Sequence, residues 1–247
     1  MQFNRLLPEP GTLSAQEAAA PLRDASPPGD RPHLALNMVA TADGRITIGG
    51  RSGPIGGDAD RELFHALREQ VDAVMVGAGT VRTERYGRIV RDPARRERRQ
   101  SAGLDPDPLA IVVSARLALD AELPLLQDPD SAVVVCTASP EEIPGCRAEV
   151  DYLRSEGSEG IVALAPALRE LRRRGVRTIL CEGGAVLNAT LLAEGLVDEL
   201  YLSIAPKLAA GSGPTSVSGP PFDPPIGLRL VSALEAGGDL FLRYRVA

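Results

Sequence analysis

The segment with the most chemistry in this sequence is Glu182-Gly183-Gly184, which follows a short apolar run. Residues 176–180 predict a buried strand, and a helical pattern begins directly after the two glycines. A strand that turns through glycines into a helix presents free backbone N–H groups and the positive end of the helix dipole. Ligands of open α/β sheets collect at the carboxyl ends of strands. The segment therefore predicts a nucleotide phosphate site beside a carboxylate, although an ordinary packing turn needs the same glycines.

Two further expected strands end in residues that suit phosphate groups. Gly77, Gly79 and Thr80 follow one of them, but Arg82 occupies the third glycine position of a Rossmann fingerprint, so a generic phosphate turn is predicted. Ser114 and Arg116 follow the other. A hydroxyl and a guanidinium there suit a ribose 2′-phosphate, the group that distinguishes NADPH from NADH. Each stretch alone also fits a plain loop, but three such strand ends together favour one nucleotide site.

The first strong strand, expected over residues 33–40, ends among side chains that suit a heterocycle. Asn37, Thr41 and Asp43 lie at or just beyond its end, and Ala40 is small enough to let a flat ring approach the backbone. An Asp-Gly pair is also common in simple turns, so a plain turn is the alternative.

A glycine-rich loop, residues 49–57, follows this strand and precedes an expected helix. Ser52 in the loop and Arg68 in the helix can together hold a substrate phosphate. The alternative for Arg68 is an ordinary surface arginine. Asp58 is the expected N-cap of the helix.

Composition sets the class of protein. The chain has 247 residues, 44% of them hydrophobic, and a net charge of −6, which suits a compact α/β fold and argues against a broad nucleic-acid surface. No apolar run approaches the ~20 residues of a membrane span, and the N-terminus lacks a signal-peptide pattern. Three scattered cysteines predict reduced thiols and a cytoplasmic protein.

Several chemistries lack their residues. The single lysine, Lys207, belongs to no P-loop motif, no nucleophile elbow is present, and no Cys/His cluster has the spacing of a zinc site, so no metal is expected. Eight arginines between residues 82 and 99 are diluted by acids. They predict a solvated, mobile loop rather than a polyanion site.

The expected elements alternate between strands and helices. Residues 1–30 are expected to form an irregular arm, with a short helix over 15–22, and residues 31–247 the main domain. Helices are expected over 58–70, 166–174 and 185–194. Strands are expected over 33–40, 72–76, 109–113, 131–136, 150–153, 176–180, 198–205 and 241–246. This order predicts a mostly parallel central sheet with helices on both faces and an antiparallel C-terminal strand.

Taken in order, these segments resemble the reductase domain of riboflavin biosynthesis, the C-terminal half of the bifunctional pyrimidine deaminase/reductase. The matching stretches are residues 37–46, Ser52 with its glycine loop, 67–68, 72–81 and 181–200. The resemblance covers residues 32–247 without any deaminase half, which implies a stand-alone reductase with a dihydrofolate-reductase-like fold.

The resemblance implies an NADPH-dependent reduction of 5-amino-6-(5-phosphoribosylamino)uracil, in which hydride reaches C1 of the ribosyl group. It also implies a homodimer, while the charge and the lack of a long apolar run predict no nucleic-acid or membrane partner. Glu182 and Asp43 are the candidate catalytic residues, with Glu182 orienting the substrate or relaying a proton. The implied substrate contacts are Asn37, Thr41, Ser52, Arg68 and Glu84. The implied cofactor contacts are Ala40, Gly77, Gly79, Thr80, Ser114, Arg116, Gly183, Gly184 and Leu187.

The sequence departs from the family pattern on the substrate side. Pro54 stands where the family often has an aromatic residue, and Glu84 stands in place of an aspartate. Two alternatives therefore stay open. One is a dihydrofolate-reductase-like enzyme acting on a pterin, which needs an acid on the helix that faces the ligand, with Glu62 as the candidate. The other is a non-catalytic NADPH-binding protein.

Overall fold

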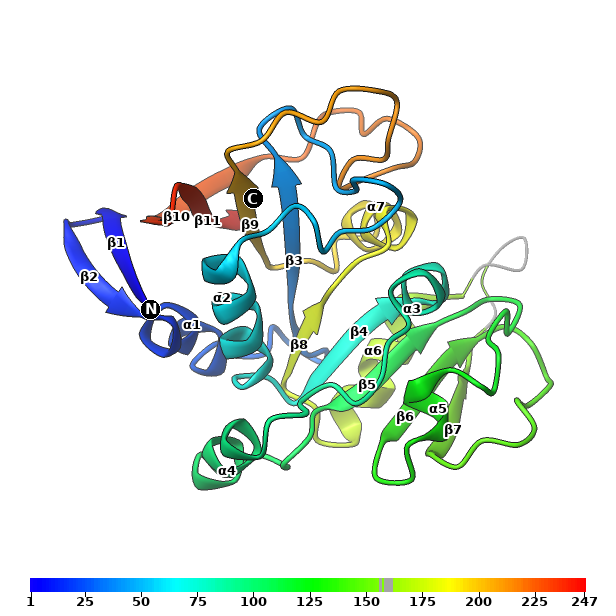
Figure 1. Ribbon diagram of the computed structural model, residues 1–247. Helices are drawn as coiled ribbons and strands as arrows, with labels where there is room; N and C mark the ends of the chain where they lie inside the picture. The colour runs from blue at the N-terminus through cyan, green and yellow to red at the C-terminus, as the bar shows by residue number, and fades with distance from the viewer. Residues whose placement is uncertain (156, 158–161) are drawn as a thin grey trace.

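Among the residues that the structure describes, the strands pair side by side in one sheet of 11 strands. Figure 1 shows their arrangement. The computed structural model describes residues 1–155, 157 and 162–247. The strands are β1 (Gln2–Leu7), β2 (Gly11–Ser14), β3 (His33–Thr41), β4 (Ala73–Gly77), β5 (Leu109–Val113), β6 (Ala132–Thr137), β7 (Glu149–Arg154), β8 (Thr178–Cys181), β9 (Glu199–Ala205), β10 (Leu228–Ala236) and β11 (Asp239–Val246). The helices are α1 (Ala15–Arg23), α2 (Asp58–Arg68), α3 (Ala78–Glu84), α4 (Pro93–Ser101), α5 (Pro124–Gln127), α6 (Leu164–Arg173) and α7 (Ala185–Ala193).

The strand order is β2-β1-β10-β11-β9-β3-β8-β4-β5-β6-β7. Neighbours from β9 to β7 run parallel, and those from β9 back to β2 run antiparallel. Apolar side chains of α1, α2 and α3 pack on one face of the sheet and those of α6 and α7 on the other. Because helices cover both faces, β8 is buried along its whole length. The predicted mostly parallel sheet with an antiparallel last strand is confirmed.

The first thirty residues are more ordered than we expected. They form the β1–β2 hairpin and α1, and β1 joins the sheet by pairing with β10. β1 was missed because only Phe3 on it is buried and its partner strand lies more than 220 residues away. The expected short helix is present, and it starts at a capping box in which Ser14 and Glu17 bond each other.

The arginine-rich segment is not the solvated loop that we expected. Part of it forms α4, and Arg99 on that helix is only 1% exposed. Its guanidinium donates to the backbone oxygens of Arg68 and Val71, at 2.7 and 2.8 Å, and so ties α4 to the end of α2. Burial lowers the pKa of Arg99 to about 10. The number of charges in the segment could not predict this helix, because it does not show which backbone carbonyls a buried arginine will bind.

The expected cap of α2 also differs. Gly57 is the N-cap, and Asp58 is the first helical residue, whose carboxylate instead pairs with Arg61 at 2.6 Å. An acid in the first turn still stabilises the helix through the dipole.

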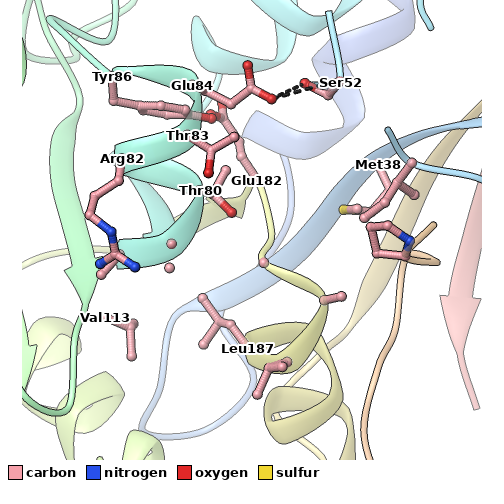
Figure 2. Close-up of a pocket in the computed structure, with 18 of the residues that line it drawn as sticks. Met38, Ser52, Thr80, Arg82, Thr83, Glu84, Tyr86, Val113, Glu182 and Leu187 are labelled. Carbon is pink, nitrogen blue, oxygen red and sulfur yellow. Dashed lines mark hydrogen bonds between the residues drawn. The ribbon is translucent and has the colours of Figure 1, made fainter. Parts of the chain in front are cut away.

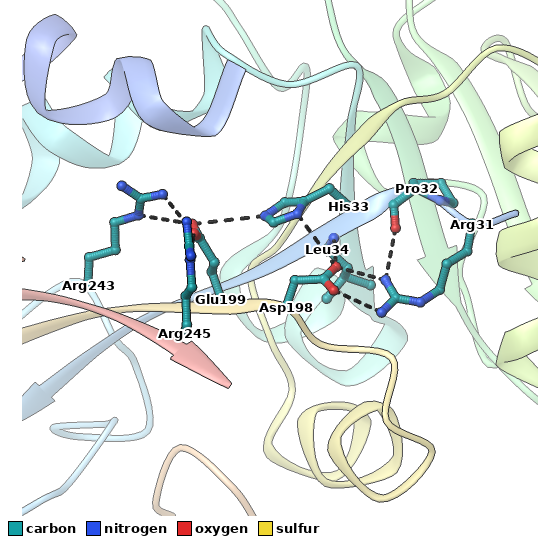
Figure 3. Close-up of polar contacts among 8 residues, drawn as sticks. All are labelled: Arg31, Pro32, His33, Leu34, Asp198, Glu199, Arg243 and Arg245. Atoms are coloured by element: carbon teal, nitrogen blue, oxygen red, sulfur yellow. Dashed lines mark hydrogen bonds and ion pairs between the residues drawn. The ribbon is translucent and has the colours of Figure 1, made fainter. Parts of the chain in front are cut away.

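A second polar cluster lies at the amino ends of β3 and β9 (Figure 3). Arg31 pairs with Asp198 at 2.7 Å, and Arg243 of β11 binds Glu199 with two nitrogens, at 3.0 and 2.7 Å. His33 lies between the two acids, and burial lowers its pKa. This cluster joins the parallel and antiparallel parts of the sheet at the amino ends of these two central strands.

In the described part of the chain, no helix combines the length and apolar character needed to cross a membrane. The three cysteines are all unpaired, and burial raises the pKa of both Cys136 and Cys181 to about 12. Neither of these two thiols therefore serves as a nucleophile near neutral pH.

Candidate active site

A cavity of about 1050 Å³ opens at the carboxyl ends of β3, β8, β4 and β5, which are neighbours in the sheet. It has two ends that we name by their residues. The glycine end is made of residues 77–80, Ser114, Arg116 and Gly184, and the acidic end is made of Asn37, Ser52, Asp60, Phe64, Glu84, Tyr86 and Glu182. The three strand ends singled out in the sequence therefore meet at one cavity. Helix α2 and the glycine-rich loop contribute to its wall.

At the glycine end, two strand-to-helix turns touch each other. The N–H of Gly77 donates to the carbonyl oxygen of Gly183 at 2.8 Å, which brings the start of α3 against the start of α7. Gly183 and Gly184 have φ angles of +89° and +77°, which only glycine adopts readily. A Cβ on Gly184 would lie 3.5 Å from Thr80 Oγ1, and one on Gly183 would lie 3.1 Å from Met38 Sδ.

This cradle has the properties of an anion site. The first turns of two helices leave unpaired backbone N–H groups at the same place, and Leu187 gives the wall an apolar patch. The residues present thus fit the pyrophosphate of a dinucleotide. Gly183 does not line the cavity itself. Its carbonyl oxygen accepts the hydrogen bond from Gly77, and the turn that it forms places Gly184 at the wall.

Ser114 and Arg116 border the glycine end on the β5 side, as we expected. Arg82 of α3 also lines the cavity (Figure 2). Its guanidinium donates to the carbonyl oxygen of Ala118. In the sequence, Arg82 stood out only because it replaces the third glycine of a Rossmann fingerprint. Its position adds a second cation to the end of the cavity where a nucleotide phosphate fits.

At the acidic end, Glu182 is held by three donors. Arg68 Nε and Nη2 bind its two carboxylate oxygens, both at 2.6 Å, and the hydroxyl of Tyr86 donates to it at 2.7 Å. The guanidinium of Arg68 also lies 4.1 Å from the ring centre of Phe64. A bidentate pair of this kind fixes both the position and the orientation of the carboxylate.

The electrostatics keep Tyr86 and Arg68 in their protonated forms. Burial, followed by the charge of Glu182, raises the pKa of Tyr86 well above its usual value, so the phenol keeps its proton. Burial alone would lower the pKa of Arg68, but the charge and hydrogen bonds of Glu182 raise it. Glu182 therefore faces the cavity as an oriented acceptor for ligand hydroxyl or N–H groups.

A second contact ties the glycine-rich loop to the wall. The N–H and hydroxyl of Ser52 donate to one oxygen of Glu84, at 2.9 and 3.0 Å (Figure 2). The only lysine of the chain supports the same loop, because Lys207 Nζ donates to the carbonyl oxygens of Pro54 and Ile55, at 2.9 and 2.8 Å. Ser52 and Glu84 thus hold the loop across the cavity.

Some expected contacts lie elsewhere. Within the described part of the chain, the cavity wall does not include Ala40, Thr41, Asp43, Arg68 or Gly183. Thr41 donates to Asp43 at 2.5 Å, and the Asp43 carboxylate also accepts from the N–H groups of Ala209 and Ala210. The hydrogen bond from Thr41, followed by those two, lowers the pKa of Asp43 to about 2. This geometry favours a turn-forming role for Asp43 rather than a catalytic one, and Arg68 acts from behind Glu182.

Three residues of the acidic end were not expected from the sequence, namely Asp60, Phe64 and Tyr86. Asp60 and Phe64 lie one helical turn apart on α2, in the same stripe as Arg68, and this i, i+4 spacing is visible in the sequence. Glu62, the acid considered for a pterin, pairs with Arg95 at 2.8 Å. Asp60 is therefore the acid of α2 that faces the cavity.

Comparison with known proteins identifies the family. Residues 32–242 match the RibD C-terminal domain. The chain is 33% identical over 195 residues to a 2,5-diamino-6-ribosylamino-4(3H)-pyrimidinone 5′-phosphate reductase of Archaeoglobus fulgidus, covering 78% of this chain and 89% of that protein. It is 31% identical to the reductase of the same name from Methanothermobacter thermautotrophicus, covering 87% and 99%.

A solved structure agrees with these relatives. The crystal structure of a pyrimidine reductase-like protein from Corynebacterium diphtheriae is 25% identical, has a TM-score of 0.76, and matches 95% of this chain and 99% of its own. The resemblance seen in the sequence is thus confirmed along nearly the whole chain, including the three strand ends that build the cavity. The chain is an oxidoreductase that is related to stand-alone pyrimidine reductases of riboflavin biosynthesis. It belongs to the RibD C-terminal domain family.

Proposed function

We propose that this protein uses NADPH to reduce a 5-amino-6-(5-phosphoribosylamino)pyrimidine, converting its ribosyl group into a ribityl chain. The observation that carries this proposal is that one cavity contains both a glycine cradle suited to phosphates and an oriented carboxylate, Glu182. The two archaeal relatives named above are reductases of the 2-amino form of this substrate. The 2-oxo form is the uracil implied by the sequence resemblance.

The glycine end would hold the cofactor. The turns at Gly77 and Gly184 leave space for the pyrophosphate, and Gly79 and Thr80 offer N–H groups at the start of α3. Arg116, together with Ser114 and Arg82, supplies the charge and hydroxyl that suit a ribose 2′-phosphate and so favour NADPH over NADH.

When bound, NADPH supplies a hydride to C1 of the ribosyl group. The protein's own residues bind, orient and exclude water. Glu182 accepts hydrogen bonds from the sugar, and Asn37 offers an amide to the ring. Ser52 and Glu84 close the loop over the ligand. Arg68 holds the Glu182 carboxylate in place through two hydrogen bonds.

We also propose that the protein is a homodimer. One face of the antiparallel strands packs on α1 and α2, but the other carries large apolar side chains. Leu240 is 38% exposed and Leu230 is 40% exposed, and Leu242 and Leu202 pair across β11 and β9 on the same face. An apolar sheet face of this kind is a natural self-association surface. Leu230→Asp with Leu240→Asp is expected to yield monomers in light scattering, whereas a monomeric wild type would refute the proposal.

The direct test follows NADPH oxidation by the purified protein. Separate reactions receive the 2-amino pyrimidine, its 2-oxo counterpart and dihydrofolate, with NADH as the cofactor control. We expect turnover with a phosphoribosylaminopyrimidine and NADPH, and a product two mass units heavier than the substrate.

The other outcomes correspond to the alternatives left open by the sequence. Turnover with dihydrofolate alone would assign the protein to pterin reduction, for which Asp60 supplies the acid on α2. Tight NADPH binding without turnover on any of the three substrates would favour a non-catalytic NADPH-binding protein.

A further inference from the structure

Helix α2 presents one stripe of side chains toward the acidic end of the cavity. Asp60, Phe64 and Arg68 are spaced four residues apart, so they share one face of the helix. Asp60 and Phe64 belong to the cavity wall, and Arg68 fixes Glu182. At a rise of 1.5 Å per residue, Asp60 lies about 12 Å along the helix from Arg68. This separation lets a ligand held at Glu182 by one end reach Asp60 with the other.

Asp60 differs from the other two acids of the cavity wall. Glu182 is occupied by Arg68 and Tyr86, and Glu84 by Ser52. Within residues 1–155, 157 and 162–247, no arginine or lysine pairs with Asp60. Its nearest cation by sequence, Arg61, is engaged by Asp58 at 2.6 Å. Asp60 is thus a cavity acid that has acceptor capacity left for a ligand.

The surroundings of Asp60 fix its position. A Cβ on Gly56 would lie 2.0 Å from Asp60 Oδ2, so the loop glycine leaves the space that the carboxylate fills. Burial, the main cause, and the neighbouring charge of Asp239 raise the pKa of Asp60, while a hydrogen bond from Ser203 lowers it. Two N–H donors from a ligand would offset the cost of burying this charge.

The two forms of the substrate differ at the ring edge that faces away from the sugar. In the 2-amino-4-oxo form, the ring N3–H and the 2-amino group are adjacent, parallel donors that match a carboxylate. In the 2-oxo form, an oxygen replaces the amino group and would face the carboxylate as acceptor against acceptor. Asn37 offers an amide donor for the 4-oxo group that both forms share. A site built for a given donor discriminates strongly against the analogue that lacks it.

We propose that Asp60 is a specificity-determining residue that binds the N3–H and 2-amino edge of the pyrimidine and selects the 2-amino substrate over its 2-oxo counterpart. This inference rests on the proposed function, because it takes the phosphoribosylaminopyrimidine as the ligand. It assigns the sugar to Glu182 and the ring to Asp60, with Phe64 beside the ring.

The test compares kcat/KM for the two pyrimidines with NADPH. The wild type is expected to favour the 2-amino form by about 10- to 100-fold. Asp60→Asn offers one acceptor and one donor, which match the 2-oxo edge, so this preference is expected to fall at least tenfold or to reverse. Asp58→Asn, in the same helical turn but outside the cavity wall, is the matched control and keeps the wild-type ratio.

The outcomes separate this inference from the function on which it rests. A wild type that favours the 2-oxo form, or an Asp60→Asn protein that keeps the wild-type ratio, would overturn the role of Asp60 alone. A wild type that reduces neither pyrimidine would overturn the proposed function, and this inference with it. The wild-type ratio needs no variant, so the proposal remains testable if Asp60→Asn does not fold.

Discussion

The two ends of the cavity are built from different parts of the chain. The glycine end is mostly backbone, with two strand-to-helix turns in contact through Gly77 and Gly183. The acidic end is mostly side chains, and Glu182, Arg68 and Tyr86 come from elements far apart in the sequence. A site made of backbone groups tolerates few substitutions at its glycines, but most substitutions of the neighbouring side chains leave it intact. A site made of side chains depends on every hydrogen-bond and ion-pair partner being present.

The largest effect is expected from breaking the acidic end at its centre. Glu182→Gln leaves the buried Arg68 without its counter-charge, and removing one partner of a buried pair costs about 3–5 kcal/mol. The melting temperature should fall by about 6–20 °C, measured by calorimetry. The KM for the pyrimidine should also rise, because the substrate loses an oriented acceptor.

Glu199→Gln is the matched control for this variant. The side chains of Glu199 and Glu182 are equally buried, each 3% exposed. Glu199 is likewise bound by two nitrogens of one arginine, Arg243, but it lies at the amino end of β9, away from the cavity. Its loss should lower the melting temperature and leave KM unchanged. Equal KM values for both variants and the wild type would contradict a ligand-binding role for Glu182.

A smaller effect is expected at the glycine end. Gly184→Ala forces a side chain into a φ of +77°, which costs about 1–2 kcal/mol. The Kd for NADPH, measured by fluorescence titration, should rise about tenfold. Gly195→Ala, at the other end of α7 with a φ of +64°, carries similar strain and should leave this Kd unchanged. If both variants bind NADPH equally well, the cradle does not hold the cofactor.

The contrast between the two ends also explains what could be predicted from the sequence. Glycines placed between a strand and a helix are visible in a single segment, so the sequence alone could single out most residues that line the glycine end. It could not single out the partners of Glu182, because Tyr86 and Arg68 lie 96 and 114 residues away and nothing local marks them. Asp43 is conspicuous in the sequence, but its position could not be predicted. An Asp-Gly turn at the end of a strand has the same sequence pattern whether or not it faces a ligand.

The same limit applies to the fold. The parallel strands were found because each is a short, buried apolar run between turn signals. β1 and β10 were missed because they are half-exposed and pair with each other across almost the whole chain. The arginine segment was misjudged because its carbonyl partners at the end of α2 are fixed only by the tertiary structure.

A weaker change tests how the loop is held. Ser52→Ala removes one of two hydrogen bonds to Glu84, worth about 0.5–1.5 kcal/mol. Because the Ser52 N–H still binds Glu84 at 2.9 Å, KM for the pyrimidine should rise only about 2- to 12-fold, with kcat nearly unchanged. Steady-state kinetics measure both. A fall in kcat with KM unchanged would show that the loop acts in the chemical step instead.

The smallest effect on turnover is expected at Asp43. Its carboxylate is engaged by Thr41 and by the N–H groups of Ala209 and Ala210, outside the cavity wall. Asp43→Asn should therefore lower stability modestly, as seen in thermal unfolding, while kcat stays within about threefold, a difference of under ~1 kcal/mol. A loss of kcat greater than a hundredfold in a folded protein would restore Asp43 as a catalytic residue.

The measurement that tests the central claim most directly follows the hydride itself. NADPH carrying deuterium at C4 of the nicotinamide, on one face and then on the other, is given to the protein with the pyrimidine substrate, and the product is examined by NMR. If the cavity joins cofactor and substrate as proposed, one of the two labelled forms places a single deuterium on C1 of the ribityl chain. Product without deuterium from either form, or with deuterium at another carbon, would contradict the account.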